Sequence, residues 1–192
     1  VIKHISKSIP INYTLIVKEH PLMNTRGWRK TSFYKEIINL PNVKLISTLV
    51  STHDVIKKVK LVITISSTTG LEALFYGKPS IVFVDSMYDE IPSVIKLEKF
   101  GDLSLKIKEA LVKDVKPEDL NLFINSVEKK SFKCDLVGLV TNLANDFFNN
   151  GFLSDVKISD ERFLDFMNKN SEPFSILADN YLKLISSDNW DS

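Results

Sequence analysis

The residues best suited to chemistry lie in one hydroxyl-rich segment, Ser66-Ser67-Thr68-Thr69-Gly70. The segment stands between an apolar, strand-like run and a stretch with helical spacing, so it is expected to form the turn that opens a helix. Backbone N–H groups in the first helical turn lack intrahelical partners, and small hydroxyl side chains add O–H donors. Phosphate is the usual occupant of such a turn. An ordinary N-cap needs only one Ser or Thr, so four in a row favour a phosphate site.

Glu72 and His20 are further candidates. Glu72 follows in the first turn of the same helix, where it is either a solvated residue favourable to the helix dipole or an acceptor for two sugar hydroxyls. His20 follows another strand-like run and precedes Pro21, which favours an extended conformation at His20. A histidine there could donate to a phosphate or act as a general acid, although a lone histidine is more often structural or merely exposed.

Other polar residues give weaker signals. Arg26 and Arg29 follow His20 and could reach a phosphate or a carboxylate, but surface arginines are common. The stretch Tyr88-Asp89-Glu90 is either a turn or a lip of the pocket. We find no metal-ligand spacing, no GxSxG motif and no Walker loop. The sequence therefore predicts no metal and no cofactor, with a helix N-terminus neutralising phosphate charge instead.

The elements that must position these residues have an α/β pattern. Four short, β-branched runs are nearly apolar on both faces, which is typical of parallel strands covered on two sides. They are residues 13–17, 43–46, 61–65 and 80–84. Segments with helical spacing lie between them, as in β-α-β units. The sequence predicts a mainly parallel sheet of at least four strands with helices on both faces, in which 61–65 and 80–84 are adjacent or nearly so.

Ligands of open parallel sheets bind beyond the carboxyl ends of the strands. His20 and Ser66 each follow a predicted strand, so we expect both loops at the same edge of the sheet. After residue 84 the pattern becomes helical, with apolar stripes around 103–111, 117–127, 136–147 and 159–186, the last interrupted near 171–174. We expect residues 1–115 to form the α/β domain and residues 116–192 a helical extension packed on it.

Composition excludes several classes of protein. The chain has 25 Lys and Arg against 24 Asp and Glu, a formal net charge of +1, which argues against a bulk nucleic-acid binder. The single cysteine, Cys134, excludes an intrachain disulfide and a cysteine zinc cluster. It fits a reducing, cytoplasmic compartment. No apolar run reaches the length of a membrane span. The chain opens Val1-Ile-Lys-His without Met, so we expect it to be a piece of a longer protein.

A family resemblance rests on several motifs in order. They are Glu19-His20-Pro21, Leu40-Pro-Asn-Val43, Thr64-Ile-Ser-Ser-Thr-Thr-Gly-Leu-Glu-Ala-Leu74 and Tyr76-Gly-Lys-Pro79. Together they resemble the C-terminal half of a GT-B glycosyltransferase, and more narrowly the capsule polysaccharide biosynthesis family related to bacterial Kdo transferases. The layout is also similar to that of UDP-N-acetylglucosamine 2-epimerases and GT-B sialyltransferases. The resemblance covers roughly residues 12–95 and implies a Rossmann-like fold, the GT-B C-terminal half.

The resemblance also implies roles for single residues. The histidine of the His-Pro motif lies near the donor phosphate in such enzymes, which falls on His20, also the candidate for a catalytic role. The hydroxyl-rich turn holds the phosphate, which falls on Ser66, Ser67, Thr68 and Thr69. The glutamate after the turn holds the donor ribose, which falls on Glu72. Epimerases have a glycine-rich turn and paired glutamates, whereas this chain has hydroxyl residues and one glutamate, which favours a transferase.

The function implied is the donor-binding half of a glycosyltransferase. It would transfer a sugar from a nucleotide-activated donor, with a CMP-sugar favoured, to a surface polysaccharide or glycolipid acceptor. Family members have an N-terminal half that supplies acceptor contacts and the catalytic acid or base, and this chain lacks it, so we expect the fragment alone to be inactive. That missing part could also provide peripheral association with the inner face of the membrane. Two alternatives stay open: a UDP-sugar 2-epimerase-like enzyme, and a non-catalytic nucleotide-binding or scaffold module.

Overall fold

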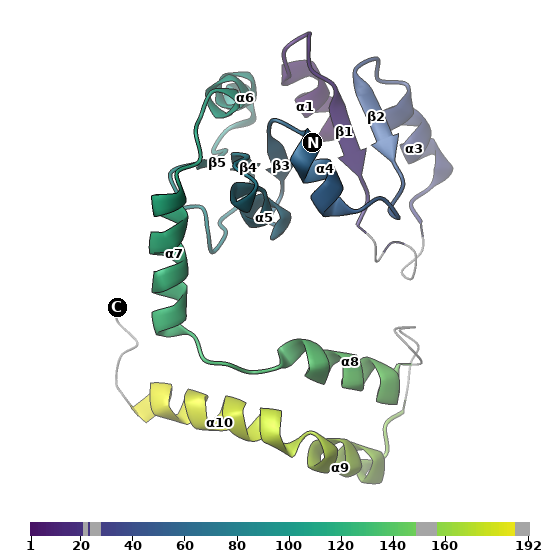
Figure 1. Cartoon of the computed structure of the whole chain (residues 1–192). Coiled ribbons are helices and arrows are strands. Elements are labelled where there is room, and N and C mark those ends of the chain that lie inside the picture. Colours follow the sequence, from purple (N-terminus) through teal and green to yellow (C-terminus); the bar gives the residue numbers. More distant parts are fainter. Residues whose placement is uncertain (21–22, 24–27, 149–156, 187–192) are drawn as a thin grey trace. The chain divides into compact units, whose positions relative to one another are not determined.

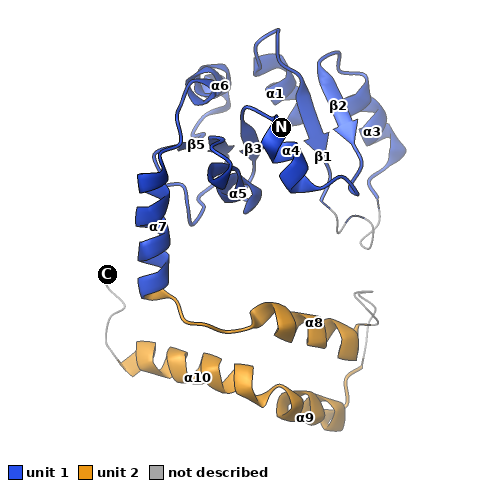
Figure 2. Cartoon of the chain, in the orientation of Figure 1, with its two compact units in different colours: residues 1–129 blue, residues 130–192 orange. Residues whose placement is uncertain are grey.

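In a computed structural model of the chain, residues 1–20, 23, 28–148 and 157–186 are described. The chain forms two compact units, Val1–Lys129 and Lys130–Ser192 (Figure 2). The first unit holds all the described strands, and the described part of the second is helical. The domain division expected after residue 115 stays a prediction.

The described strands of the first unit form two parallel ladders (Figure 1). The strands are β1 (Leu15–Lys18), β2 (Val43–Ile46), β3 (Val62–Thr64), β4 (Ser80–Val82) and β5 (Val94–Lys96). One ladder pairs β1 with β2, and the other has the order β3-β4-β5. Every pairing is parallel, and β3 and β4 are neighbours with Val62 opposite Ser80. The predicted α/β class and the parallel pairing of 61–65 with 80–84 are confirmed.

The sheet differs from the prediction in two respects. We expected one continuous sheet of at least four strands, but no described ladder joins β1 to β3. The structure also adds β5, which the sequence analysis missed because its apolar run has only two residues, Val94 and Ile95, whereas the runs around β3 and β4 are longer than the strands themselves. A run that short gives no usable periodicity.

Helices link and flank these strands. The first unit contains α1 (Ile2–Ser8), α3 (Thr31–Ile38), α4 (Thr52–Lys58), α5 (Thr69–Phe75), a short 3₁₀ turn at Phe100–Asp102, α6 (Leu103–Leu111) and all but the last residue of α7 (Pro117–Lys130). Ser51 caps α4 by accepting the N–H of Asp54 at 3.4 Å. After α5 the chain turns at Gly77, whose positive φ of 67° explains why glycine stands there. The sequence analysis missed α1, although Ile2, Ile5 and Ile9 have helical spacing.

Helices cover both faces of the second ladder. Ile81 on β4 is buried in one cluster with Ile5 of α1 and with residues of α6. The next residue, Val82, points to the opposite face and is buried with Leu74 of α5 and with residues of α7. Both β4 side chains are 0% exposed. β4 is therefore the centre of the layered core, with α1 and α6 on one face and α5 and α7 on the other.

Tyr88 holds the loop between β3 and α5 through a hydrogen bond and a close packing contact. Its side chain is 1% exposed, and its hydroxyl donates to the carbonyl oxygen of Ser67 at 2.6 Å. Gly70 at the start of α5 lies against the ring, and a Cβ there would come within 2.4 Å of the Tyr88 oxygen. Burial raises the pKa of the Tyr88 phenol, so the group stays protonated as a donor.

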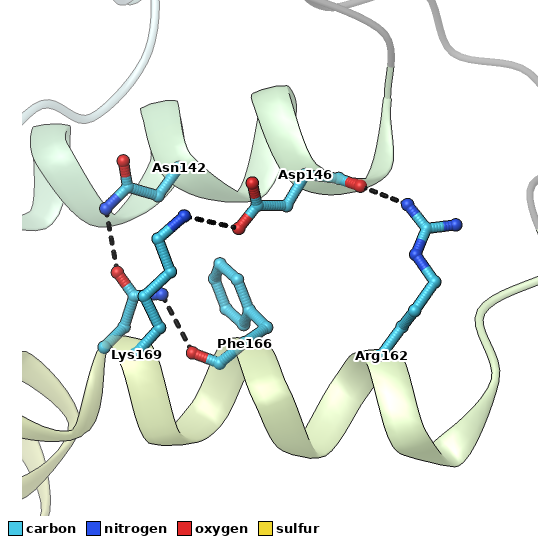
Figure 3. A network of polar contacts seen from close by, with 6 residues as sticks. Asn142, Asp146, Arg162, Phe166 and Lys169 are labelled. Atoms are coloured by element: carbon cyan, nitrogen blue, oxygen red, sulfur yellow. Dashed lines mark hydrogen bonds and ion pairs between the residues drawn. The ribbon is translucent and has the colours of Figure 1, made fainter.

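The described part of the second unit consists of α8 (Leu136–Phe147), α9 (Asp160–Lys169) and α10 (Ser171–Ser186). Phe147 and Phe166, both buried, pack with ring centroids 5.1 Å apart. The amide of Asn170 joins the helices: its oxygen accepts from Asn142 at 2.8 Å, and its nitrogen donates to the Phe166 carbonyl at 2.8 Å (Figure 3). The helix break at Asn170 lies next to the one predicted near 171–174.

The described helices were also compared with the requirements of a membrane span. Among the described residues, none of the helices combines the length and the apolar character that a bilayer span requires.

Tyr88→Phe tests the support of the loop. We expect a loss of about 1 kcal/mol of unfolding free energy in urea titrations at pH 7, because the Ser67 carbonyl loses its partner. The pKa of Tyr88 is raised in the folded state, so the unfolded state loses this proton first as the pH rises above about 10. The stability advantage of the wild type over the variant should therefore be constant below that pH and shrink above it. An advantage that stays constant up to pH 11 would contradict the assignment.

Candidate functional site

A cleft of about 960 Å³ lies between β1 and β3. All four residues of β1 line it, as do residues 61–65, which contain β3. Residues of α1, α3, α4 and α6 complete the walls. Along the strands the lining is mainly apolar. Polar lining residues lie in the segments that follow β1 and β3 and also on α1, α3 and α4.

The strand order makes this cleft a distinctive place in the fold. From β1 the chain passes to β2 on one side, and from β3 it passes to β4 on the other. Both β1 and β3 line the cleft, and their chain connections lead to β2 and to β4, an arrangement similar to the topological switch point of an open α/β sheet. Loops that leave the sheet in opposite directions open a crevice there, where such folds bind their ligands.

Three of the predicted site residues line the cleft, namely His20, Ser67 and Thr69. His20 is exposed and directly follows Glu19 at the end of β1. Ser67 and Thr69 are half-buried in the loop after β3. The structure thus brings the histidine and two of the four hydroxyl residues to one cavity, although their loops are far apart in the sequence.

The hydroxyl-rich loop is organised by its own side chains. Ser67 donates its N–H to the hydroxyl of Thr64 at 3.2 Å, and its own hydroxyl accepts the N–H of Thr69 at 3.2 Å. The hydroxyls of Ser67 and Thr69 lie 3.0 Å apart. Two amides that the sequence analysis expected to face an anion therefore have partners within the loop. The hydroxyl protons of Ser67 and Thr69 are the groups that can turn toward a ligand in the cleft.

The remaining predicted residues lie outside the cleft lining. Ser66 and Thr68 are exposed. Thr68 donates its hydroxyl to the Glu72 carboxylate at 3.1 Å, so Glu72 is engaged in bracing the loop. A contact from Glu72 to a bound sugar would require this hydrogen bond to be exchanged or shared.

Arg29 and Lys18 also line the cleft. The sequence analysis treated Arg29 as a weak signal and did not single out Lys18. The Arg29 side chain donates to the Glu19 carboxylate at 2.9 Å, and its guanidinium lies 5.0 Å from the centre of the Phe33 ring. Arg29 thus meets a carboxylate, one of the two partners expected for it. Lys18, the last residue of β1, lines the same cleft and adds a positive charge. Its position directly before Glu19-His20 was the available signal.

Two positions named in the sequence analysis, Pro21 and Arg26, lie outside the described residues.

The stretch Tyr88-Asp89-Glu90 forms a turn and does not line the cleft. Asp89 accepts the N–H of Ser86 at 3.1 Å, which closes the turn. Tyr88 lies beneath the hydroxyl-rich loop and supports it through the Ser67 carbonyl. Of the two alternatives left open for this stretch, the turn is the one observed.

A smaller cavity of about 290 Å³ lies in the second unit, between α8 and α9. Its cations are already engaged: Arg162 donates to the Asp146 carbonyl, and Lys169 lies 3.4 Å from the Asp146 carboxylate (Figure 3). These contacts join α8 to α9. In the described part of the chain, no group of three or more His, Cys, Asp or Glu side chains is arranged to hold a metal ion.

Comparisons with known proteins give one match. No curated protein and no solved structure matches the chain. Residues 1–92 match the model of a family described as capsule polysaccharide biosynthesis protein. The matched segment contains β1 to β4, the loops after β1 and β3, and every predicted site residue. The N-terminal part of this chain is therefore similar to proteins of capsule polysaccharide biosynthesis.

Proposed function

We propose that the chain is the donor-binding half of a glycosyltransferase that acts in capsule polysaccharide synthesis. The donor is a nucleotide-activated sugar, with a CMP-sugar as the first candidate, and the acceptor is a polysaccharide or a glycolipid. One observation carries the proposal: His20, Ser67 and Thr69 line one cleft between β1 and β3, within the segment that resembles the capsule family.

Each cleft residue has a part in this proposal. Ser67 and Thr69 donate their hydroxyl protons to the donor phosphate, and Lys18 contributes positive charge nearby. His20 donates to the phosphate or serves as the general acid. Glu72 exchanges its hydrogen bond with Thr68 for the ribose hydroxyls when the nucleotide binds. The acceptor surface and a catalytic carboxylate belong to the part of the enzyme outside this chain, so the chain by itself binds the donor without transferring the sugar.

Ser67→Ala should weaken nucleotide binding, and Ser66→Ala provides a matched control in the same loop. Isothermal titration with CMP, CDP, UDP and GDP first identifies the preferred nucleotide. We expect Ser67→Ala to cost about 1.5–3 kcal/mol of its binding free energy, the range for hydrogen bonds to charged groups. Ser66→Ala should leave the Kd unchanged, because Ser66 lies outside the cleft.

Melting curves of both variants separate binding from folding. Ser67→Ala also removes the acceptor for the Thr69 N–H, so its unfolding free energy should fall by about 1 kcal/mol. If both serine variants bind the nucleotide with the wild-type Kd, the hydroxyl loop is only a well-braced helix start and the phosphate site is refuted.

Glu72→Gln tests the ribose contact separately. A carboxylate accepts hydrogen bonds from two hydroxyls, whereas an amide offers one accepting oxygen, so nucleotide affinity should fall by about threefold to tenfold. Affinity for free pyrophosphate, which has no ribose, should stay the same. Equal losses for both ligands would show that Glu72 acts by bracing Thr68 and not by contacting the sugar.

Nucleotide binding should not depend on a divalent metal. Hydroxyl groups, His20 and Lys18 supply the donors and the positive charge that a metal would otherwise provide. Titrations in EDTA and in excess Mg²⁺ should give the same Kd within error. A loss of affinity in EDTA that Mg²⁺ restores would require a metal ligand set outside the described residues.

A further inference from the structure

A group of aromatic and charged side chains borders the cleft on the β1 side and has no part in the phosphate site described above. Glu19 directly follows β1, and the other members stand just before α3 or in its first turn. Glu19, Arg29 and Phe33 line the cleft together with His20. We call this group the aromatic cluster, which consists of Glu19, Trp28, Arg29, Phe33 and Tyr34.

Polar and ring contacts hold the aromatic cluster together. Oε1 of Glu19 accepts from the Arg29 Nε at 2.9 Å and from the Tyr34 hydroxyl at 3.4 Å. The same hydroxyl accepts the backbone N–H of Arg29 at 3.4 Å. The Arg29 guanidinium lies 5.0 Å from the centre of the Phe33 ring, which packs edge-to-face with Tyr34 at a centroid distance of 5.4 Å. These side chains are therefore ordered before a ligand arrives, which lowers the entropic cost of binding.

Trp28 is the exposed aromatic ring of the cluster. It packs edge-to-face with Tyr34, with centroids 6.4 Å apart and an angle of 68° between the rings. Trp28 is nevertheless 57% exposed, although tryptophan is highly buried on average. The cluster thus presents a flat apolar surface to the solvent on an ordered support.

The charges of the cluster restrict the kind of ligand that suits this surface. Glu19 and Arg29 neutralise each other, so the pair gives no net attraction for a phosphate or a nucleic acid. A wholly apolar partner would remove water from both charges without offering hydrogen bonds in exchange, which is costly. The ligand that fits has an apolar face with hydrogen-bonding groups around it.

A pyranose ring has both properties. Its C–H groups are slightly positive and pack on the negative face of an aromatic ring. Its hydroxyls donate to a carboxylate and accept from a guanidinium. The Glu19–Arg29 pair is joined through Oε1 and Nε. Because a carboxylate has several acceptor positions and a guanidinium has several N–H donors, both side chains retain groups for the hydroxyls of a sugar.

The position of the aromatic cluster separates this ligand from the nucleoside of the donor. A nucleobase also stacks on tryptophan. The cluster lies at the end of β1, however, whereas Glu72, to which the proposed function assigns the ribose, is on α5 beyond β3. A phosphate bound by Ser67 with its ribose at Glu72 directs the nucleoside toward α5 and leaves Trp28 to another ligand.

We propose that the aromatic cluster is a saccharide subsite, in which Trp28 stacks on a pyranose ring while Glu19 and Arg29 bind its hydroxyls. Its assignment to the acceptor saccharide rests on the proposed function, because Glu19 directly precedes His20, the group that donates to the phosphate there. The subsite extends onto this chain an acceptor surface that otherwise lies outside it.

The fluorescence of Trp28 tests the subsite directly. The chain has two tryptophans, Trp28 and Trp190, so Trp190→Phe leaves Trp28 as the reporter. Hexasaccharides of glucose, of N-acetylglucosamine and of galacturonic acid are titrated separately up to about 10 mM, since binding at an open surface is weak. At least one of them should shift the emission to shorter wavelengths in a saturable manner, because a stacked sugar displaces water from the indole. No shift with any of the three overturns the proposal.

Calorimetric titrations of variants that keep Trp190 measure the contribution of the ring. With the hexasaccharide that binds, Trp28→Ala should weaken binding by about tenfold, and Trp28→Phe, which keeps a smaller ring, by about threefold. Phe75→Ala is the matched control, because Phe75 is 58% exposed but lies on α5 outside the cleft lining, and its Kd should equal that of the wild type. An unchanged Kd for Trp28→Ala, or an equal loss in Phe75→Ala, overturns the proposal.

The nucleotide separates this proposal from the proposed function. The preferred nucleotide, titrated alone into the Trp190→Phe protein, should leave the emission of Trp28 unchanged. A saturable change would show that the nucleobase stacks on Trp28 and would overturn the saccharide assignment. Saccharide binding at Trp28 in a chain that binds no nucleotide supports the subsite and refutes only the proposed function.

Discussion

The hydrogen bond from the Tyr88 hydroxyl to the Ser67 carbonyl holds the loop after β3, which carries the candidate site residues, in place. It ties the turn after β4 to the loop after β3, and the ring that carries it is buried with α5, β4, β5 and α7. A buried phenol needs a hydrogen-bond partner, and the loop carbonyl of Ser67 provides it. Gly70 is the sequence feature that this arrangement demands, because any side chain there would displace the ring. The position of Ser67 in the cleft therefore follows from the core.

Two kinds of surface meet in the cleft, and they suit different occupants. The rim at the loops presents hydroxyls, an imidazole and an ammonium group, which suit an anion in water. The strands present a mainly aliphatic lining, which suits an apolar group.

Much of the architecture was predictable because local signals agreed with the tertiary structure. The β-branched runs and the helix stop at Gly77 gave the order of elements, and the Ser51 cap and the helix break near Asn170 formed close to where the sequence placed them. β5 was not predictable, since its apolar run has only two residues, and the interruption between β1 and β3 has no local signature. Within the site, the sequence could place residues on one edge of the sheet. It could not tell Ser67 from Ser66, because that distinction depends on the tertiary contacts of the loop, such as the hydrogen bond from Tyr88 to the Ser67 carbonyl.

The contact between α1 and α6 has a consequence for the order of folding. Each ladder pairs strands that follow one another along the chain, so each can form early with a small loop-closure cost. The core beneath them is different, because Ile5 of α1 is buried with Ile107 of α6, from far later in the sequence. Such a non-local contact forms slowly. During synthesis on a ribosome, the first helix and its ladder would wait, with Ile5 exposed to water, until α6 had left the exit tunnel. Over that interval the nascent chain would present an apolar helix face and open strand edges together, the features that chaperones bind.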